Sequence, residues 1–371
     1  MRKVFVITER RADYSRFKPI LDLIHSDPLL TYDLVVTGLH LKEEHGSTID
    51  EIRRDGFNIA ATFPMFLESA DTGASMTRAF AEALRQVTYE LEKSRPDIIL
   101  SGFDIAANAA VTIAGAHMNI PVAHIQGGEV TGTIDESIRH AMSKFAHYHF
   151  AANNDACARL IKMGERPDSV FDVGCPSIDA MLCVADNNEI LEKFGLKDNF
   201  LLMIQHPVTT EVNLARSQIE TTLKSVKASN VDALVIMPNN DAGYSSIIDS
   251  IKGSNIKFVE SLSIDDYVNL LKRSSVLVGN SSSGIHEAAT FNIPVVNIGS
   301  RQQGRLRPKN VIDVDHDFLK IKNAIEEGVA IKRQGRHFDN PYGNGNSAPK
   351  IVELLKNIDI SNNVIQKRIT Y

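Results

Sequence analysis

Residues 276–287 read VLVGNSSSGIHE, and this stretch decides how the rest of the chain is interpreted. The apolar, β-branched residues at its start predict a short buried strand that ends at Gly279. The small residues that follow predict a turn, and a helix is expected over about residues 285–291, where an Asn-Ile-Pro sequence ends it. Backbone N–H groups at the start of such a helix have no internal partner and carry partial positive charge. This strand–turn–helix therefore suits a phosphate or diphosphate.

Side chains around this turn fit the rest of a nucleotide. Ser281 and Ser282 supply hydroxyl donors, and Glu287, about one helical turn further on, could accept hydrogen bonds from two vicinal ribose hydroxyls. A second strand over residues 294–298 is followed by Arg301, which is then expected at the carboxyl edge of the sheet, where open α/β folds bind ligands. The simpler alternative is an ordinary strand–turn–helix in which the serines only cap the helix.

Strand and helix patterns alternate along the chain in two series. The first series covers residues 4–183, and the second begins at residue 200. Alternation of this kind predicts an α/β protein with parallel, doubly wound sheets covered by helices on both faces. The polar residues 185–198 mark a hinge between two such domains, which face a cleft. We expect domains at residues 1–184 and 185–345, and within residues 346–371 a last helix that packs back on the first domain.

The composition excludes several classes of protein. The chain has 371 residues, more than one core usually takes, and its hydrophobic content is 43%. A net charge of −6 and the lack of a basic cluster argue against nucleic acid as a partner. Three cysteines without CxxC spacing indicate a reducing compartment. The most apolar segment, residues 105–125, is interrupted by polar residues, so we expect a cytoplasmic protein that spans no membrane.

No cofactor and no metal are expected. The first strand is not followed by a GxGxxG sequence, which argues against a dinucleotide cofactor. His147 and His149 flank Tyr148, which points to the other face of a strand. These two histidines resemble a metal-binding pair only weakly, because no carboxylate has a matching spacing.

Three acidic residues follow neighbouring strands of the first domain. Asp104 comes after the strand at residues 97–101, Glu129 comes after the strand at residues 121–125, and Asp135 lies at the start of the next helix. Because parallel strands end at one edge of a sheet, these carboxyls are expected to converge on the cleft. They would raise one another's pKa and so provide a proton-transfer group near neutrality. Two simpler alternatives remain: Asp104 caps a helix, and Asp135 pairs with Arg139.

Other strand ends carry further candidate binding residues. Arg11 and Ser15 follow the first strand, where Arg11 would hold a diphosphate or nucleotide, or would be a solvated arginine beside a capped helix. His206 follows the first strand of the second domain and would face the carboxylates across the cleft. A histidine there can bridge a diphosphate and a reacting sugar. Asn239, in a later strand-end loop, is available to the nucleotide.

Taken together, these motifs resemble the hydrolysing UDP-N-acetylglucosamine 2-epimerase family, most closely its sialic- and legionaminic-acid branch. The similar segments occur in the family's order: RADYS at residues 11–15, GGE at 127–129, GTID at 132–135, SIRH at 137–140, HPVTT at 206–210, GNSS at 279–282 and GSRQ at 299–302. The resemblance implies a glycosyltransferase-B-like fold, in which two Rossmann-like domains surround the cleft. It also implies a homodimer or homotetramer that acts on a UDP-sugar without a metal.

The resemblance implies roles for individual residues as well. Asp104 and Asp135 match acid/base positions, Glu129 is a further catalytic candidate, and His206 would lie near the diphosphate and the sugar. The residues expected to contact the nucleotide are Arg11, Ser15, Asn239, Ser281, Ser282, Glu287 and Arg301.

The implied reaction has two stages. A base removes the proton at C2 while the nucleotide diphosphate leaves C1, which gives a 2-acetamidoglycal. Water then adds across the double bond, and C2 is protonated on the opposite face. UDP and a free 2-epimer of the N-acetylmannosamine type are released. Because the C2 proton is barely acidic, stabilisation of the leaving group must carry much of the work.

Two positions depart from the family's pattern. Gln126 stands where many members have glutamate, and it cannot act as a base, so proton transfer falls to Asp104, Asp135 or Glu129. Ile105 stands where some members have arginine, which predicts a more apolar pocket. The alternative substrate is therefore a 6-deoxy or 4-acetamido sugar nucleotide such as UDP-N,N′-diacetylbacillosamine. A glycosyltransferase, or an inactive UDP-sugar sensor on the same fold, remains as a further alternative.

Overall fold

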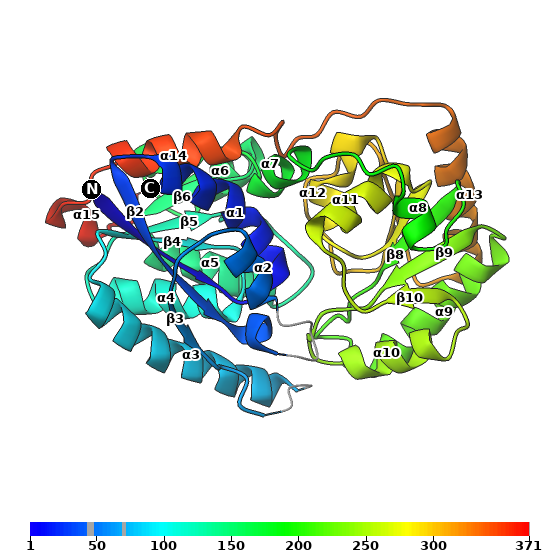
Figure 1. Ribbon diagram of the computed structural model, residues 1–371, viewed down its shortest axis with the longest axis horizontal. Helices are drawn as coiled ribbons and strands as arrows, with labels where there is room; N and C mark the ends of the chain where they lie inside the picture. The colour runs from blue at the N-terminus through cyan, green and yellow to red at the C-terminus, as the bar shows by residue number, and fades with distance from the viewer. Residues whose placement is uncertain (43–47, 69–71, 371) are drawn as a thin grey trace.

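Two parallel β-sheets organise the chain into two lobes in the computed structural model, which describes residues 1–42, 48–68 and 72–370 (Figure 1). The strands of the N-terminal sheet are Arg2–Thr8 (β1), Leu30–Thr37 (β2), Ile59–Phe63 (β3), Ile98–Gly102 (β4), Val122–Ile125 (β5), Tyr148–Ala151 (β6) and Val170–Asp172 (β7). The strands of the C-terminal sheet are Phe200–Ile204 (β8), Asp232–Ile236 (β9), Lys257–Val259 (β10), Val276–Gly279 (β11), Val295–Ile298 (β12) and Val311–Val314 (β13).

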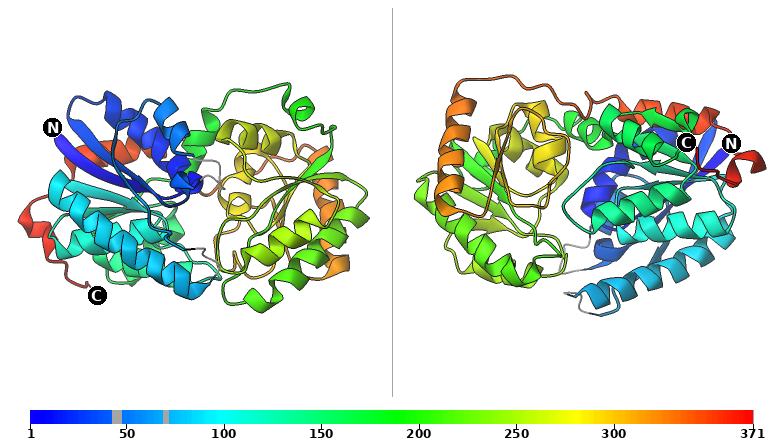
Figure 2. Two further views of the ribbon diagram at one scale, coloured as in Figure 1. Left: turned by 60° about the horizontal axis from the view of Figure 1, so that its bottom comes forward. Right: turned by 180° about the vertical axis from the view of Figure 1, so that it is seen from behind.

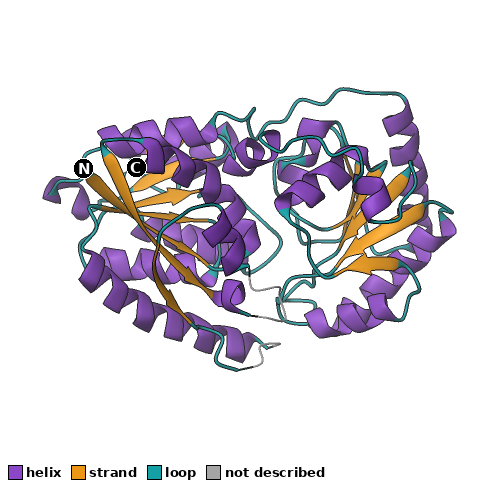
Figure 3. Cartoon of the chain, viewed as in Figure 1, coloured by secondary structure: helices purple, strands orange, loops and turns teal. Residues whose placement is uncertain are grey.

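Helices cover both faces of each sheet (Figure 3). Those of the N-terminal lobe are Arg11–Ser26 (α1), Ile49–Arg54 (α2), Gly73–Ser94 (α3), Ala106–His117 (α4), Asp135–Phe145 (α5), Asn154–Lys162 (α6) and Pro176–Leu182 (α7). The chain continues with Ile190–Lys193 (α8), Ala215–Ala228 (α9), Tyr244–Lys252 (α10), Ile264–Arg273 (α11), Ser283–His286 (α12) and Phe318–Arg333 (α13). It ends with Ser347–Asn357 (α14) and Asn362–Ile365 (α15).

Alternating side chains of the central strands explain why both faces need cover. Val4 and Val6 of β1 belong to the core that includes apolar residues of α1 and α14. Phe5 and Ile7 belong to the core on the other face, against α3 and α4. Because side chains alternate along a strand, a run of apolar residues buries both faces at once. The C-terminal sheet likewise has one core on each face.

The last helices return to the first lobe. Helix α14 supplies Ile351 and Leu355 to the core beneath α1, and the chain reaches it by a long crossing from α13 in the second lobe (Figure 2). The side-chain hydroxyl of Tyr148 in β6 donates to the carbonyl of Asp359, 2.6 Å away. The two sheets have separate hydrophobic cores. The domain boundaries at residues 184 and 345 stay a prediction.

The strand orders place the ends of four strands around one cleft. The orders are β3-β2-β1-β4-β5-β6-β7 and β10-β9-β8-β11-β12-β13, so the direction of winding reverses between β1 and β4 and again between β8 and β11. Ligands of doubly wound sheets bind beyond the carboxyl ends of the strands at such switch points. The two-domain, Rossmann-like fold expected from the sequence is confirmed, and its topology predicts where the site lies.

The helix after β11 differs from the expectation. It begins at Ser283, two residues earlier than expected, and ends at His286, and a separate 3₁₀ turn covers Ala288–Phe291. Glu287 between them has φ −118° and ψ −37°, a widened right-handed helical conformation, and Asn292 adopts a left-handed conformation with φ 54°. This tight reversal returns the chain to β12 within a few residues. A single turn of helix has fewer aligned peptide dipoles than the continuous helix that the sequence suggested.

Candidate functional site

Two connected cavities occupy the cleft between the lobes. The outer cavity has a volume of about 530 Å³, and the inner one has a volume of about 60 Å³. Arg16 of α1 and Ser282 after β11 line both, so the cavities meet between these two side chains. A wider hollow of about 800 Å³ lies on the C-terminal lobe between β13 and α13 and contains none of the predicted site residues.

The outer cavity collects the residues that the sequence assigned to the nucleotide. Those that line it are Arg11, Ser15, His206, Asn239, Ser281, Ser282 and Glu287. Arg301 lines the inner cavity instead. Arg11 joins the lobes, because its Nε is 3.1 Å from Oε2 of Glu51 and its Nη1 donates to the carbonyl of Leu262, 2.8 Å away. The structure therefore brings these residues together, while their contacts with a nucleotide stay a prediction.

His206 is held in one orientation and one protonation state. Its Nδ1 accepts a hydrogen bond of 3.2 Å from the backbone N–H of Asn239. Burial, together with the positive charge of Arg301, lowers the pKa of His206 to about 3. The imidazole is therefore neutral near pH 7, and with Nδ1 accepting, its proton is on Nε2, which can donate to an anionic oxygen. His206 lies with the nucleotide-side residues and does not line the inner cavity with the carboxylates.

Asn280 ties three strand-end loops to one another. Its side chain accepts from the backbone N–H of His206 at 2.7 Å and donates to the carbonyl of the same residue at 2.9 Å. Its own carbonyl accepts from Gln302 at 2.9 Å. The preceding Gly279 has φ 127°, and a Cβ there would lie 2.0 Å from the carbonyl oxygen of Ile204. Only glycine allows this approach, so the turn in residues 276–287 requires glycine at this position.

Cations from both lobes face the region where the cavities meet. Arg16 lies 4.9 Å from the ring of Phe103 and 3.8 Å from the carboxylate of Glu287, which is 4% exposed. Asp241 lies between Arg10 of the first lobe, at 3.8 Å, and Arg301 of the second, at 3.7 Å. Several arginines around one cleft favour an anionic ligand, and these partly buried ion pairs hold the arginines in place.

Asp104 lines the inner cavity as an ion-paired carboxylate. Arg139, whose side chain is almost fully buried, donates to Asp104 from Nη2 and to the carbonyl of Glu129 from Nη1, at 2.9 Å for the second bond. Burial raises the pKa of Asp104, but Arg139 and Arg305 outweigh it and hold the pKa below its ordinary value. Arg139 therefore pairs with Asp104, and the alternative of an Asp135–Arg139 pair along the helix is wrong.

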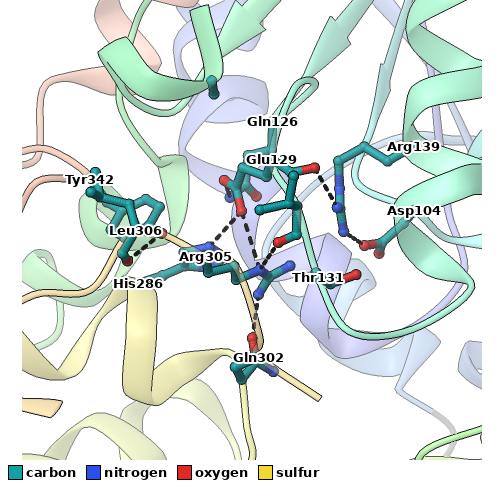
Figure 4. Close-up of polar contacts among 12 residues, drawn as sticks. Asp104, Gln126, Glu129, Thr131, Arg139, His286, Gln302, Arg305, Leu306 and Tyr342 are labelled. Atoms are coloured by element: carbon teal, nitrogen blue, oxygen red, sulfur yellow. Dashed lines mark hydrogen bonds and ion pairs between the residues drawn. The ribbon is translucent and has the colours of Figure 1, made fainter. Parts of the chain in front are cut away.

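Glu129 joins the two lobes (Figure 4). Its Oε2 lies 2.9 Å from Nε2 of His286 and 3.6 Å from Nε of Arg305, and its Oε1 accepts from the side-chain amide of Gln126 at 3.1 Å. The carboxylate is 4% exposed. Burial raises the pKa of Glu129, but His286, Arg305 and Arg139 outweigh that effect and lower it far below the ordinary range. Both oxygens are thus occupied by protein donors.

Asp135 is the unpaired carboxyl of the three. It begins α5 and lines the inner cavity, and no ion pair to it occurs within the described parts of the chain. Burial and the negative charges of Asp104 and Asp241 raise its pKa above the ordinary 3.8, although Arg301 opposes them. The expected convergence of three carboxyls is confirmed. The expectation that they raise one another's pKa holds for Asp135 only, because arginines and a histidine compensate the other two.

Two residues beside these carboxyls have left-handed backbones. Phe103, after β4, has φ 70°, and Gln126, after β5, has φ 58°. Non-glycine residues adopt this conformation rarely, and such positions concentrate at functional sites. Ile105 is 8% exposed, belongs to the core beneath α1 and lines neither cavity. The argument that Ile105 makes the pocket more apolar is therefore wrong, because its side chain points into the core.

The two histidines considered as metal ligands have other partners. Nδ1 of His147 accepts from the backbone N–H of Val122 at 3.0 Å, and Nε2 of His149 lies 2.9 Å from Glu165. Within residues 1–42, 48–68 and 72–370, no group of three or more His, Cys, Asp or Glu side chains is arranged so that it could hold a metal ion. None of the helices in those ranges is both long and apolar enough to cross a lipid bilayer.

Several site residues were missed by reasoning from the sequence. They are Arg10, Arg16, Thr131, Arg139, His286, Gln302 and Arg305. Most act through partners distant in the chain, as when Glu129 meets His286 and Arg305, and no local spacing announces such a pair. One signal was available, because Arg305 and Gln302 follow Arg301 in the same strand-end loop.

Residues 22–356 match the sequence profile of a family described as UDP-N-acetylglucosamine 2-epimerase. The chain belongs to the UDP-N-acetylglucosamine 2-epimerase family. The resemblance drawn from the motifs is thereby confirmed, and the cavities described above are the cleft of an epimerase-family protein.

Relatives of this epimerase-family chain cover its whole length. It is 35% identical over 375 residues to the UDP-N,N′-diacetylbacillosamine 2-epimerase (hydrolyzing) of Legionella pneumophila, with 99% of both chains covered. It is 32% identical over 377 residues to a UDP-N-acetylglucosamine 2-epimerase of Neisseria meningitidis, with 99% of this chain and 98% of that one covered. A crystal structure of a Neisseria meningitidis UDP-GlcNAc 2-epimerase bound to UDP-GlcNAc superposes with a TM-score of 0.80 at 18% identity, covering 96% and 100% of the chains. That likeness shows a common fold.

Proposed function

We propose that this protein is a hydrolysing UDP-sugar 2-epimerase. It converts UDP-N-acetylglucosamine, or a close 2-acetamido analogue, to UDP and the free 2-epimer by elimination of UDP and hydration of a 2-acetamidoglycal. The observation that carries the proposal is the arrangement of the cleft. An unpaired carboxyl with a raised pKa, Asp135, lines a small inner cavity that opens into a larger cavity surrounded by arginines and a neutral histidine.

In this proposal the outer cavity binds the nucleotide, and the inner cavity holds the groups that act on the sugar. UDP occupies the outer cavity, where Ser281, Ser282 and Nε2 of His206 donate to the diphosphate and Glu287 accepts from the ribose. The departing diphosphate gains charge, and fixed donors and arginines stabilise that charge without reorganising. The sugar's C1–C2 edge then meets the inner cavity, where Asp135 removes the proton from one face of C2, and the proton that completes the 2-epimer is added on the opposite face. Asp104, paired with Arg139, orients the sugar and keeps its own charge.

Glu129 has a positioning role in this proposal. Its oxygens accept from His286 and Gln126, and Oε2 also lies 3.6 Å from Arg305, so these neighbours already compensate its charge. Its low pKa also makes it a weak base. The proton duty that the sequence left open among Asp104, Asp135 and Glu129 therefore falls to Asp135.

Release of UDP in D₂O tests the proposed reaction. With UDP-N-acetylglucosamine as the only substrate, we expect UDP and a free sugar that carries deuterium at C2. A glycosyltransferase would release the sugar without deuterium at C2 and only slowly, because it lacks an acceptor. An inactive sensor would bind UDP, as measured by calorimetry, and would form no product. Either of these results would contradict the proposal.

A second candidate substrate is UDP-N,N′-diacetylbacillosamine. The support for it is the 35% identity with a relative that is named for this substrate. Parallel assays of UDP release with both sugar nucleotides distinguish the two. A higher kcat/KM for the bacillosamine derivative would assign the protein to the legionaminic-acid branch, and a higher value for UDP-N-acetylglucosamine would assign it to the sialic-acid branch. Homodimer or homotetramer formation is part of the proposal and is measured by light scattering.

A further inference from the structure

Beyond α15 the chain lies against the N-terminal lobe. Nε2 of His147 donates to the carbonyl of Ile365 at 3.2 Å. The backbone N–H of Thr370 donates to the carbonyl of Gly164 at 3.1 Å. Between these two contacts, the side chain of Lys367 reaches the carboxyl end of α5.

Lys367 binds backbone carbonyls at the end of α5, where a helix leaves its last carbonyls without an internal partner. The carbonyl of Met142 still accepts from the backbone N–H of Ala146 at 2.8 Å. The next carbonyls accept instead from Nζ of Lys367, at 2.9 Å for Ser143, 3.1 Å for Lys144 and 2.6 Å for Ala146. The carboxyl end of a helix also carries partial negative charge, which an ammonium group compensates. Lys367 therefore caps α5 from a segment more than 200 residues further along the chain.

A buried carboxylate holds the ammonium group of Lys367 in place. Oε2 of Glu165 lies 2.6 Å from Nζ of Lys367 and 2.9 Å from Nε2 of His149. Its Oε1 accepts from Nζ of Lys144 at 2.6 Å, and Glu165 is 2% exposed. Burial raises the pKa of Glu165, but these three partners outweigh burial and lower the pKa to about 2. Glu165 is therefore ionised near neutral pH and is a fixed counter-ion for Lys367.

The first turns of α5 belong to the site. Asp135 and Arg139 line the inner cavity, and they lie with Ser143 at intervals of four residues on one face of the helix. Oγ of Ser143 donates to the carbonyl of Arg139 at 3.1 Å. About 12 Å of helix separates Asp135 from the first carbonyl that Lys367 binds. Because backbone hydrogen bonds make a helix stiff, a displacement at its carboxyl end also moves its first turn.

We propose that Lys367 is a positioning residue for the epimerisation: by binding the carbonyls at the end of α5, it fixes where the helix holds Asp135 and Arg139. The inference rests on the proposed function and adds a residue that lines neither cavity of the cleft. Misplacing a reacting group by about 1 Å can cost roughly a hundredfold in rate. Arg139 moves with the same helix, so its ion pair with Asp104 depends on the same contact.

Lys367→Met tests this role, because methionine keeps an unbranched apolar side chain and removes the ammonium group. We expect kcat for UDP release to fall between about tenfold and a hundredfold. KM and the affinity for UDP should stay unchanged, since the residues proposed to bind the nucleotide do not lie on α5. Hydrogen exchange followed by mass spectrometry should show faster exchange in α5. Rates are compared at a temperature at which calorimetry shows each variant to be folded.

Three further variants control for the lost charge and for folding. Lys367→Arg keeps the charge and several N–H donors, and it should recover most of the lost rate. Lys356→Met removes another ion-paired lysine, whose Nζ lies 3.2 Å from Asp27 and 2.8 Å from Glu353, and it should leave kcat unchanged. If Lys367→Met fails to fold, combining it with Glu165→Gln also removes the buried carboxylate that has lost its counter-ion.

The outcomes distinguish this inference from the proposed function. A lower kcat with faster exchange in α5, restored by Lys367→Arg, supports the inference. A normal kcat in folded Lys367→Met overturns it whether or not α5 exchanges faster, because Lys367 would then only stabilise the fold. An equal fall of kcat in Lys356→Met also overturns it. If the unmodified protein releases no UDP from either sugar nucleotide, the proposed function is wrong, and the role of Lys367 in turnover falls with it.

Discussion

Glu129 and Asp135 line the same inner cavity and behave in opposite ways. Glu129 is surrounded by donors from both lobes, and its pKa is far below the ordinary range. Asp135, at the start of α5, has no ion-pair partner in the described parts of the chain, and its pKa is raised by burial and by neighbouring negative charges. Two acids six residues apart thus differ in what compensates their charge.

In the proposed reaction, this difference decides which acid takes part in proton transfer. A carboxylate whose charge is fully compensated stabilises the structure and loses its basicity, whereas an uncompensated one stays poised to exchange a proton. Position beside a cleft is shared by both residues and does not separate them. Ion-pair partners separate them, and those partners come from the opposite lobe in the case of Glu129.

The largest effect is expected on protein stability, when the ion pairs of Glu129 are removed. Glu129→Gln leaves the buried guanidinium of Arg305 without its counter-ion. Removing one member of a buried pair costs about 3–5 kcal/mol, and urea unfolding should show a loss of that order. Glu82→Gln, which removes an ion pair with Arg85 on the surface of α3, should cost less than about 1 kcal/mol. Equal losses in the two variants would contradict the structural role of Glu129.

Asp135, whose charge no ion pair in the described residues compensates, should control the rate of turnover. Asp135→Asn removes the proton-exchanging group and should lower the rate of UDP release by about a hundredfold. Binding of UDP, measured by calorimetry, should be unchanged. Asp155→Asn is the matched control, because Asp155 also lies in the first turn of a helix, α6, outside the cleft. A near-normal rate in Asp135→Asn would return the proton duty to Asp104 or Glu129.

A smaller effect is expected at the outer cavity. His206→Ala removes the Nε2 donor proposed for the diphosphate and should weaken UDP binding by about tenfold, the effect of one hydrogen bond to a charged group. His337→Ala, at a position where the side chain is 79% exposed, should leave the affinity unchanged. Calorimetry with UDP measures both. If His206→Ala binds UDP as tightly as the unmodified protein, His206 does not contact the diphosphate.

The smallest expected effect is a difference between the two acids in how pH changes the stability of the protein. The pKa of Asp135 is raised in the folded state, so its stabilising contribution is present below the ordinary 3.8 and is lost as pH rises through the folded-state pKa. Asp135→Asn should therefore have a higher melting temperature than the unmodified protein near pH 7, and the difference should vanish in acid. Glu129 has a lowered pKa, so its contribution is present near pH 7 and is lost as pH falls. Parallel melting curves from about pH 2 to pH 8 test both signs.

Most of the fold could be predicted from the sequence, because periodicity is local. The strand over Val276–Gly279 has the expected bounds. The helix after β11 was predicted wrongly, since the reversal at Glu287 and Asn292 depends on where β12 must begin in the sheet. Local propensity carries no information about that requirement.

The sequence predicts which carboxyls belong to the site, but it predicts only part of their electrostatics. Strand ends converge in any doubly wound sheet, so Asp104, Glu129 and Asp135 could be grouped from their positions alone. Which carboxyl is neutralised depends on partners such as Arg139 and His286, which approach from other elements. The same limit misplaced Ile105, whose direction into the core follows from the start of α4.

The return of α14 to the first lobe bears on how the chain folds during synthesis. Ile351 and Leu355 complete the core beneath α1, yet they follow the whole second lobe in sequence. A ribosome therefore exposes residues 1–184 long before their last apolar neighbours emerge. The second lobe, whose sheet uses only residues 200–314, can finish first. A nascent chain of this protein is expected to mature from its middle outward, and a premature stop after α13 would leave the earlier-made half exposed to proteases.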